Sequence, residues 1–361
     1  MSEKQTWRVI DTGVRSAAEN MAMNKTLLEG HQEGITPHTL RFLQFTPSVL
    51  LGFHQSAEQE LKLDYCKENN IEVQRRMTGG GAIYFDQTQI GWELYLDKRA
   101  LGTADMSAIA KKICEAAAEG MSKLGVDAKF RPRNDIEVDG RKISGTGGAF
   151  DGDSILYQGT LLVDFDVERM LKTLRIPAEK LSDKAISSAR ERVVNLKELL
   201  GEAPDMEKVK ACITESFAKA FDVGFKEVTD LTPEEDIAFK ENLAEIDSPE
   251  WVYQHNASTE FGPITQAIYK CDGGLMRASI SFDTKRNIVK QVWLTGDFFV
   301  SPQRMINDLE AALKDTPADQ VEQKVNDFFT NNSAEMLMLK PENFVTVINM
   351  ALEQAMQPET A

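Results

Sequence analysis

Residues 74–86, with the sequence QRRMTGGGAIYFD, constrain the fold of this chain more than any other stretch. Two arginines, Arg75 and Arg76, run into glycines at positions 79–81, and an apolar, β-prone run follows. Glycine is the most costly residue to order, so three in a row indicate a backbone that bends unusually or contacts a ligand. Amides in such a turn can form an anion-binding nest beside the arginine charges. A plain glycine turn with solvated arginines fits the segment equally well.

A second dense region, residues 130–150 (FRPRNDIEVDGRKISGTGGAF), combines a hairpin signal with charge and glycines. Asp139-Gly140 between two short β-prone stretches predicts a β-hairpin. Strand alternation then places Lys142 and Ser144 on one face of it. Lysines that discourage aggregation of an edge strand would explain the charge. They would not explain the adjacent Asn134-Asp135 pair or the second glycine cluster.

The overall charge makes this local positive charge informative. The formal net charge is −16 over 361 residues, which argues against general binding to nucleic acid or to anionic membranes. Against that background, four basic residues fall within a dozen positions: Arg131, Arg133, Arg141 and Lys142. The length favours two domains, and no apolar run approaches the roughly 20 residues of a membrane helix.

Cysteine usage and the N-terminal residues indicate the compartment. The four cysteines are far apart and lack metal-ligand spacing. The N-terminal MSEKQTWRVIDTG lacks the apolar segment of a secretory signal. We therefore expect reduced thiols in a cytoplasmic protein.

The first two hundred residues predict interleaved helices and strands. Apolar residues at helical spacing predict helices at 16–29, 57–69, 106–124, 167–174 and 195–200. Apolar, β-prone runs predict strands at 39–45, 48–53, 71–75, 89–96, 136–138, 141–144 and 154–165. Gly159 interrupts the last strand, which indicates a bulge or a close backbone approach. The basic residues of 184–192 could face an anionic ligand or be solvated.

The remaining chain predicts a different unit. Two helices and an acidic, proline-containing linker are expected within 205–249. Strands at 264–270, 275–281 and 287–294 precede helices at 303–314, 318–329 and 341–355. A β-meander followed by helices indicates a small α+β unit. We therefore predict domains at 1–202 and 261–361, joined by a helical linker or hinge at 203–260.

Five segments together resemble the lipoate–protein ligase family, within the biotin/lipoate ligase superfamily. They are RRMTGGGA at 75–82, NDI at 134–136, KISG at 142–145, GTLL at 159–162 and SSARERVVNL at 187–196. Each segment is weak alone, but five in this order and spacing are a specific combination. The resemblance implies an α/β (α+β) fold: a large catalytic domain with a central mixed or antiparallel sheet and a small C-terminal accessory domain.

The resemblance also implies a reaction. Ligases of this family use ATP to convert lipoate or octanoate to an acyl-adenylate, and then pass the acyl group to a lysine of a lipoyl carrier. Catalysis then depends on positioning and charge stabilisation, and Mg²⁺ is implied by the use of ATP. Lys142 lies where the family has its essential lysine, which contacts the acyl carbonyl and the phosphate. The substrate and adenylate residues implied by the resemblance are Arg76, Thr78, Gly79, Gly80, Gly81, Ala82, Asn134, Asp135, Ser144, Gly159 and Thr160, with Asp135 also as the metal ligand.

Two departures from the family concern the acyl pocket. Many relatives have a histidine where this chain has Phe85, and two histidines where it has Tyr157-Gln158. Both departures remove titratable groups, so the preferred acyl chain stays open.

Two other functions remain as alternatives. An octanoyltransferase of the superfamily works without ATP and holds the acyl group on a cysteine, but neither Cys114 nor Cys212 is at the expected position. A silent lipoate- or carrier-binding protein would have little need of Lys142. The expected partner is a lipoyl carrier: the H protein of glycine cleavage, the lipoyl domain of a 2-oxoacid dehydrogenase E2, or a related lipoate-binding protein. We expect no nucleic acid or membrane partner.

Overall fold

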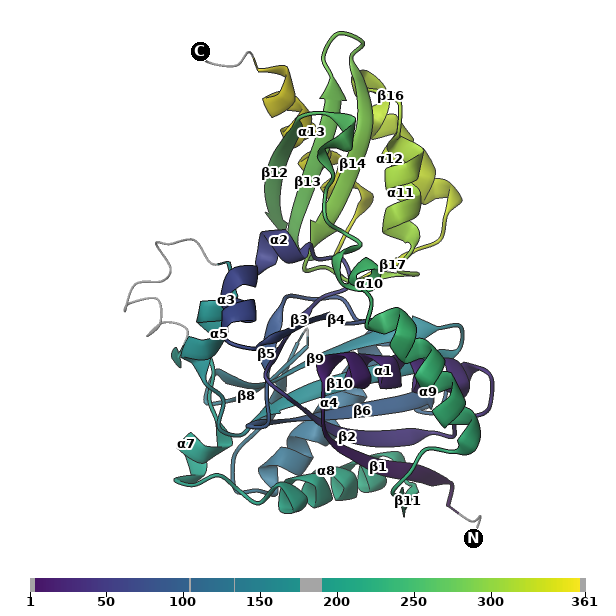
Figure 1. Ribbon diagram of the computed structural model, residues 1–361. Helices are drawn as coiled ribbons and strands as arrows, with labels where there is room; N and C mark the ends of the chain where they lie inside the picture. Colours follow the sequence, from purple (N-terminus) through teal and green to yellow (C-terminus); the bar gives the residue numbers. More distant parts are fainter. Residues whose placement is uncertain (1–3, 104, 133, 176–189, 358–361) are drawn as a thin grey trace. The chain divides into compact units, whose positions relative to one another are not determined.

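The computed structural model describes residues 4–357, apart from residue 104, residue 133 and residues 176–189. Its contacts divide the chain into two compact units. The first comprises Met1–Leu50, Lys62–Met77 and Ile83–Ser248, and the second comprises Leu51–Leu61, Thr78–Ala82 and Pro249–Ala361. The predicted fold class, an α/β catalytic region with a smaller C-terminal α+β region, is confirmed (Figure 1).

The first unit is built on an eight-stranded mixed sheet of order β11-β1-β2-β6-β10-β9-β8-β7. Strand β1 runs parallel to both of its neighbours, and the other neighbouring strands of this sheet run antiparallel to each other. The strands are β1 (Thr6–Arg15), β2 (Thr39–Phe45), β6 (Gln89–Asp97), β7 (Lys129–Arg131), β8 (Asp135–Val138), β9 (Arg141–Asp151), β10 (Ser154–Leu162) and β11 (Gly224–Val228). A second sheet of order β4-β3-β5 contains β3 (Ser48–Leu51), β4 (Glu72–Arg75) and β5 (Ile83–Phe85).

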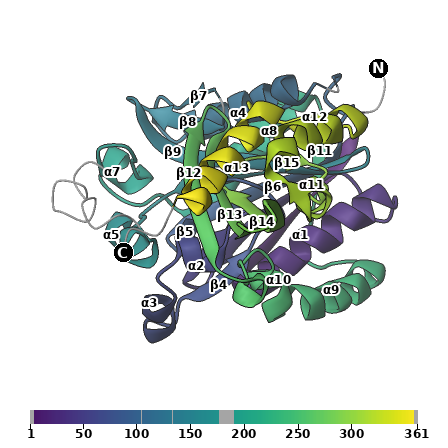
Figure 2. The same cartoon turned by 90° about the horizontal axis from the view of Figure 1, so that it is seen from above.

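Helices cover both faces of the large sheet (Figures 1 and 2). On one face, α4 (Met106–Ser122) and α8 (Met206–Phe221) pack on Trp92 and Leu94 of β6 and form the main core. On the other face, α1 (Ala17–Gln32) lies beside α9 (Pro233–Ile246) and packs on Tyr95 and Leu156. Ser16 and Glu19 form the predicted capping box of α1. The sheet is therefore buried on both sides. The shorter helices are α3 (Leu63–Glu68), α5 (Val167–Thr173) and α7 (Leu196–Leu200).

The single helix predicted over 57–69 is wrong. Helix α2 (Ala57–Glu60) ends where Leu61 becomes extended, at φ −119° and ψ 147°, and α3 begins two residues later. The break has a physical reason, because α2 is anchored within the second unit. Gln59 accepts a hydrogen bond from Thr295 at 2.7 Å, and Glu60 pairs with Arg277. A continuous helix would withdraw these side chains from their partners.

The second unit contains a meander covered by helices on one face. Strands β12 (Ile264–Cys271), β13 (Gly274–Asp283) and β14 (Ile288–Gly296) are antiparallel, and β16 (Thr316–Pro317) extends the sheet. Helices α11 (Met305–Leu313), α12 (Val321–Asn331) and α13 (Pro341–Met356) enclose its core. The three predicted strands and the late helices are confirmed. Short strands β15 (Val300–Ser301) and β17 (Glu335–Met336), helix α10 (Pro249–Tyr253) and two 3-10 turns (Thr259–Phe261 and Ala318–Gln320) complete it.

Residues 203–260, predicted as a helical linker or hinge, contain α8, β11, α9 and α10. Strand β11 pairs with β1, and Glu235 of α9 forms a buried ion pair with Arg8 at 2.7 Å. A hinge role for this region stays a prediction. In the part of the chain that the structure describes, no helix is long and apolar enough to cross a membrane.

Candidate active site

The β8–β9 hairpin places a lysine and an aspartate against each other. Asp139 and Gly140 adopt φ values of 50° and 76°, which the tight hairpin turn requires, so the predicted hairpin is confirmed. Lys142 Nζ lies 2.8 Å from Asp135 Oδ1, and Arg131 donates to Asp135 Oδ2 at 2.5 Å. Burial raises the pKa of Asp135, but the two cations outweigh burial and hold that pKa below its ordinary value. The carboxylate therefore stays ionised and fixes the lysine.

A glycine lies directly below the ammonium group of this lysine. A Cβ atom built on Gly145 would lie 2.7 Å from Lys142 Nζ and 2.9 Å from its Cε. The amide of Gly145 donates to Thr160 Oγ1 at 3.2 Å, which brings β10 to the same point. Lys142, Asp135, Gly145 and Thr160 thus share one face of the sheet. Lys142 remains 37% exposed, so its charge is accessible from solvent.

Ser144 does not share that face, so the alternation prediction is wrong. The register of β8 with β9 shifts between Ile136 and Glu137, which inserts one extra residue. Ser144 pairs with Ile136, a core residue, whereas Lys142 contacts the preceding Asp135. Consecutive strand residues point to opposite faces. The buried Ser144 hydroxyl, which has no hydrogen-bond partner among the residues that the structure describes, therefore lies on the α4 side of the sheet.

Gly159 does not form a bulge, which was one of the two explanations predicted for it. Strand β10 pairs with β6 without a register shift from Ser154 to Leu162, so there is no bulge. A Cβ atom on Gly159 would lie 2.2 Å from Cζ2 of Trp92. The glycine allows the indole to pack against the backbone, which is the close approach that the sequence also suggested. The space that a side chain at position 159 would need is therefore occupied by Trp92.

Asn134 acts locally as a clamp between two segments. Its side-chain amide donates to the carbonyl of Thr146 at 2.8 Å, and its own carbonyl accepts from the Thr146 amide at 2.8 Å. Both bonds fix the turn that leads into Asp135. A direct contact of Asn134 with nucleotide stays a prediction.

The arginines before the glycine loop are buried rather than solvated. Arg76 donates to the carbonyl of Leu50 at 2.7 Å. Burial lowers the pKa of Arg76 to about 10, and burial followed by the charge of Arg76 lowers that of Arg75 to about 9. Both side chains still carry charge at neutral pH. A solvated pair of arginines is therefore excluded.

The glycine loop, residues 78–82, packs tightly within the second unit. A Cβ atom on Gly79 would lie 2.4 Å from the carbonyl oxygen of Phe298, and Gly80 has a left-handed φ of 95°. The carbonyl of Thr78 accepts from the amide of Phe53 at 2.9 Å. Glycine is thus required here by close backbone packing and conformation. Binding of phosphate by residues 78–82, including Ala82, stays a prediction.

A magnesium site is not preformed in the described residues. Both carboxylate oxygens of Asp135 already bond to cations. No group of three or more His, Cys, Asp or Glu side chains that could hold a metal occurs in residues 4–357 outside the gaps. The role of Asp135 as a metal ligand stays a prediction.

All four cysteines lie in the described chain. Cys114 of α4 contacts Thr146 of β9 and Tyr157 of β10 from the face opposite Lys142. Burial raises the pKa of both Cys114 and Cys66. Cys212 lies in α8, at the edge of the same core, and Cys271 donates weakly to a carbonyl in its own hairpin at 3.5 Å. None of the three thiols in the first unit contacts Lys142 in the part of the chain that the structure describes.

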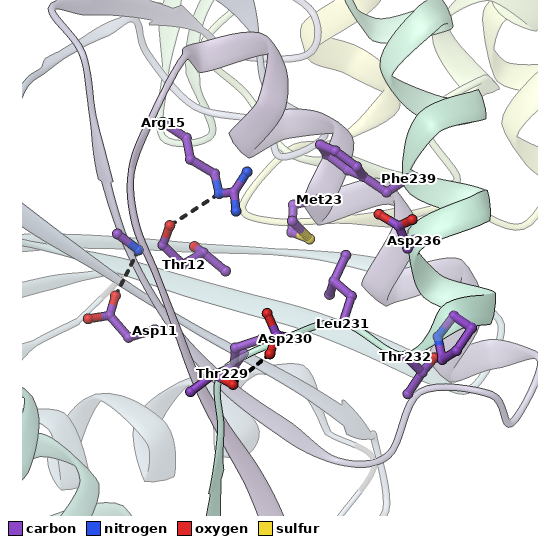
Figure 3. A pocket seen from close by; sticks show the side chains of 13 residues that line it. Asp11, Thr12, Arg15, Met23, Thr229, Asp230, Leu231, Thr232, Asp236 and Phe239 are labelled. Carbon is purple, nitrogen blue, oxygen red and sulfur yellow. Dashed lines mark hydrogen bonds between the residues drawn. The ribbon is translucent and has the colours of Figure 1, made fainter.

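A separate cavity of about 790 Å³ opens between β1, α1 and α9 (Figure 3). Met23, Leu231 and Phe239 supply apolar surface there. Its polar groups are largely engaged: Arg15 donates to the Thr12 carbonyl, and three lining carboxylates have their own partners. The cavity contains none of the predicted site residues, and we assign no chemistry to it.

Sequence comparison gives the relatives of the chain. The family described as "Lipoyl protein ligase A/B catalytic domain" matches residues 16–218. The chain is 29% identical over 242 residues to lipoate-protein ligase A subunit 1 of Thermoplasma acidophilum, covering 64% of this chain and 90% of the relative. It is 28% identical over 274 residues to octanoyltransferase LipM of Kyrpidia tusciae, covering 69% and 99%.

The fold is also similar to that of a solved structure from this family. The crystal structure of lipoate-protein ligase A bound with ATP aligns with a TM-score of 0.60 and 25% identity. The alignment covers 69% of this chain and 98% of that one. The chain is thus related at similar sequence identity to lipoate-protein ligases and to an octanoyltransferase.

Proposed function

Because the chain belongs to the lipoyl protein ligase A/B catalytic domain family, we propose that it is an ATP-dependent lipoate–protein ligase. In the first step, a carboxylate oxygen of lipoate or octanoate attacks the α-phosphorus of ATP, and pyrophosphate leaves. In the second step, a lysine amine of a lipoyl carrier attacks the acyl carbon of the adenylate. AMP leaves, and the amine loses its proton as the amide forms.

The placement of the cysteines is the observation that carries this proposal against transfer without ATP. A transferase needs a thiolate that can hold the acyl group as a thioester near the reacting centre. Cys114 is the cysteine that contacts β9 and β10, and it is fully buried on the face away from Lys142. Burial also raises the pKa of the Cys114 thiol, which opposes formation of the thiolate. The ligase reaction requires no such group.

The geometry of the hairpin supports the adenylation step of this proposal. Negative charge develops between the acyl carboxylate and the phosphate, and a fixed cation stabilises it most when it needs no reorganisation. Lys142 is already held by Asp135 at 2.8 Å, on the face that also carries Thr160. The glycine loop and Arg76 are proposed to bind phosphate. ATP is proposed as the nucleotide, with any Mg²⁺ brought by its phosphates.

Octanoyl transfer is the second candidate, and the LipM relatives favour it. One of them matches this chain over 99% of its own length at 28% identity. The partner in either case is proposed to be a lipoyl carrier domain.

The test is the intact mass of an apo lipoyl carrier incubated with this protein, lipoate, Mg²⁺ and ATP. We expect a lipoyl mass gain that disappears when ATP is omitted. A parallel reaction offers octanoyl-carrier as donor and apo carrier as acceptor, without ATP. Octanoyl transfer in that reaction, with no gain from free lipoate and ATP, would overturn the ligase proposal and favour the transferase.

A glycine substitution tests the fixed position of the lysine. Alanine at Gly145 would place its Cβ 2.7 Å from Lys142 Nζ, so the ammonium group must move. The moving atoms end a flexible side chain, so we expect the melting temperature to change little. Acyl-adenylate formation should fall about 10- to 100-fold, because small misplacements at a reacting centre are costly.

The matched control is Gly224→Ala in β11, where the nearest atom to a new Cβ is Thr6 Oγ1 at 3.8 Å. That variant should form acyl-adenylate at the wild-type rate. Equal rates for Gly145→Ala and Gly224→Ala, measured as pyrophosphate release, would remove Lys142 from the proposed centre.

A further inference from the structure

Three side chains outside the predicted site form a closed hydrogen-bonded cluster beneath the hairpin. They are Cys114 of α4, Thr146 of β9 and Tyr157 of β10. The Thr146 and Tyr157 hydroxyl oxygens are 3.0 Å apart, and Cys114 Sγ lies 3.4 Å and 3.3 Å from them, respectively. All three side chains are buried. A buried polar cluster with every member bonded is costly to build and is rigid once formed.

The available hydroxyl and thiol protons indicate which group donates and which accepts in this cluster. The single hydroxyl proton of Thr146 is donated to the carbonyl of Asn134 at 3.0 Å. With that proton engaged, we assign the Tyr157 hydroxyl as donor to the Thr146 oxygen; the 3.0 Å separation itself is compatible with either atom as donor. The thiol of Cys114, a weak donor, then donates to the oxygen of Tyr157 or of Thr146. Burial, followed by the neighbouring thiol, raises the pKa of Tyr157 well above its ordinary value, so its donor is retained.

The chain of donors ends one residue before Asp135, the carboxylate that holds Lys142. Asn134 receives the Thr146 hydroxyl and amide and returns its side-chain amide to the Thr146 carbonyl. The next residue, Asp135, holds Lys142 at 2.8 Å. Strand β8 has only four residues and is shifted in register after its second one. Asp135 is the first residue of this strand, so the clamp at Asn134 fixes the backbone where the strand begins.

We propose that Thr146, Tyr157 and Cys114 are positioning residues, which act through Asn134 to hold the Asp135–Lys142 pair in place. This inference rests on the proposed function, since it assigns Lys142 to the reacting centre. None of the three touches substrate in this proposal. Their contribution is the geometry of a charged pair on the opposite face of the sheet.

Thr146→Val and Thr146→Ser form the decisive pair of variants. Valine keeps the shape of threonine but removes the hydroxyl, whereas serine keeps the hydroxyl. We expect Thr146→Val and Tyr157→Phe to lower kcat for acyl-adenylate formation about 10-fold, with the KM for lipoate changed less than about twofold. Thr146→Ser should stay within about threefold of the wild-type kcat. Wild-type kcat in Thr146→Val and Tyr157→Phe would overturn the proposal.

A double-mutant cycle separates positioning from general core packing. In an Asp135→Asn background, Thr146→Val should add no further loss of kcat if it acts through Asp135. Full multiplication of the two losses would indicate independent damage and would also overturn the proposal.

A readout without activity keeps this test distinct from the proposed function. We expect faster amide hydrogen exchange at residues 134–136 in Thr146→Val than in Thr146→Ser, while exchange in β6 is unchanged. If the wild-type protein formed no acyl-adenylate, the proposed function would fail, yet the exchange experiment would still test the clamp. Equal exchange in the two variants would show that the hydroxyl does not hold Asn134.

Discussion

Lys142→Ala is expected to abolish ATP-dependent lipoylation while leaving the protein folded. The loss should reach about 100- to 1,000-fold in kcat for acyl-adenylate formation, the usual effect of removing one group that stabilises developing charge. The fold should tolerate the change because Lys142 is more than one-third exposed. Its partner Asp135 would keep the bond to Arg131, so no buried carboxylate would be left without a cation. The measurements are pyrophosphate release and thermal unfolding of the same preparations.

The matched control is Lys129→Ala on the neighbouring strand β7. Lys129 is a solvent-exposed lysine that pairs with Asp127 at 2.7 Å, so it has the same side chain in the same hairpin region without the proposed role. Its variant should lipoylate a carrier at the wild-type rate. Retained ligation by Lys142→Ala, or equal losses in both lysine variants, would contradict the assignment of Lys142.

The sequence predicts the parts of the site that depend on local chemistry. Asp139-Gly140 can hardly form anything but a tight hairpin turn, and the structure has that turn at positive φ values. The glycines at 79–81 indicated unusual backbone or close approach, and both are present. The capping box of α1 likewise follows from residues three positions apart. Each of these features is determined by neighbours in the chain.

Features that depend on distant residues were not predictable from the pattern. The register shift that turns Ser144 away from Lys142 reflects how β8 fits its partner strand, not the alternation within β9. The sequence leaves Gly159 open between a bulge and a close backbone approach, because the indole of Trp92, which decides between them, lies 67 residues away in the sequence. The cluster of Cys114, Thr146 and Tyr157 joins a helix to two strands. In the sequence, Cys114 stands out only as a candidate nucleophile, and its place among apolar residues at helical spacing gives no sign of a polar partner.

Glu93→Ala should cause the largest loss of stability that we predict. Glu93 and Arg41 face each other across β6 and β2, 3.0 Å apart, and both are buried. Asn24 and Tyr95 also donate to the Glu93 carboxylate, each at 2.7 Å. Removing the carboxylate leaves the Arg41 charge uncompensated in the interior. We expect a loss of about 3–5 kcal/mol in the free energy of unfolding.

The double variant Arg41→Met/Glu93→Leu shows whether the cost comes from the unpaired charge. It removes both ions, so we expect it to recover the part of the loss that comes from the unpaired Arg41 charge, although Asn24 and Tyr95 still lose their acceptor. The surface pair of Asp236 and Lys240, 2.6 Å apart on α9, is the matched control. Asp236→Ala should cost less than about 1 kcal/mol, because water screens that pair. Chemical unfolding of the four proteins, followed by circular dichroism, measures these differences. If Glu93→Ala lost no more stability than Asp236→Ala, the explanation by an uncompensated buried Arg41 charge would be wrong.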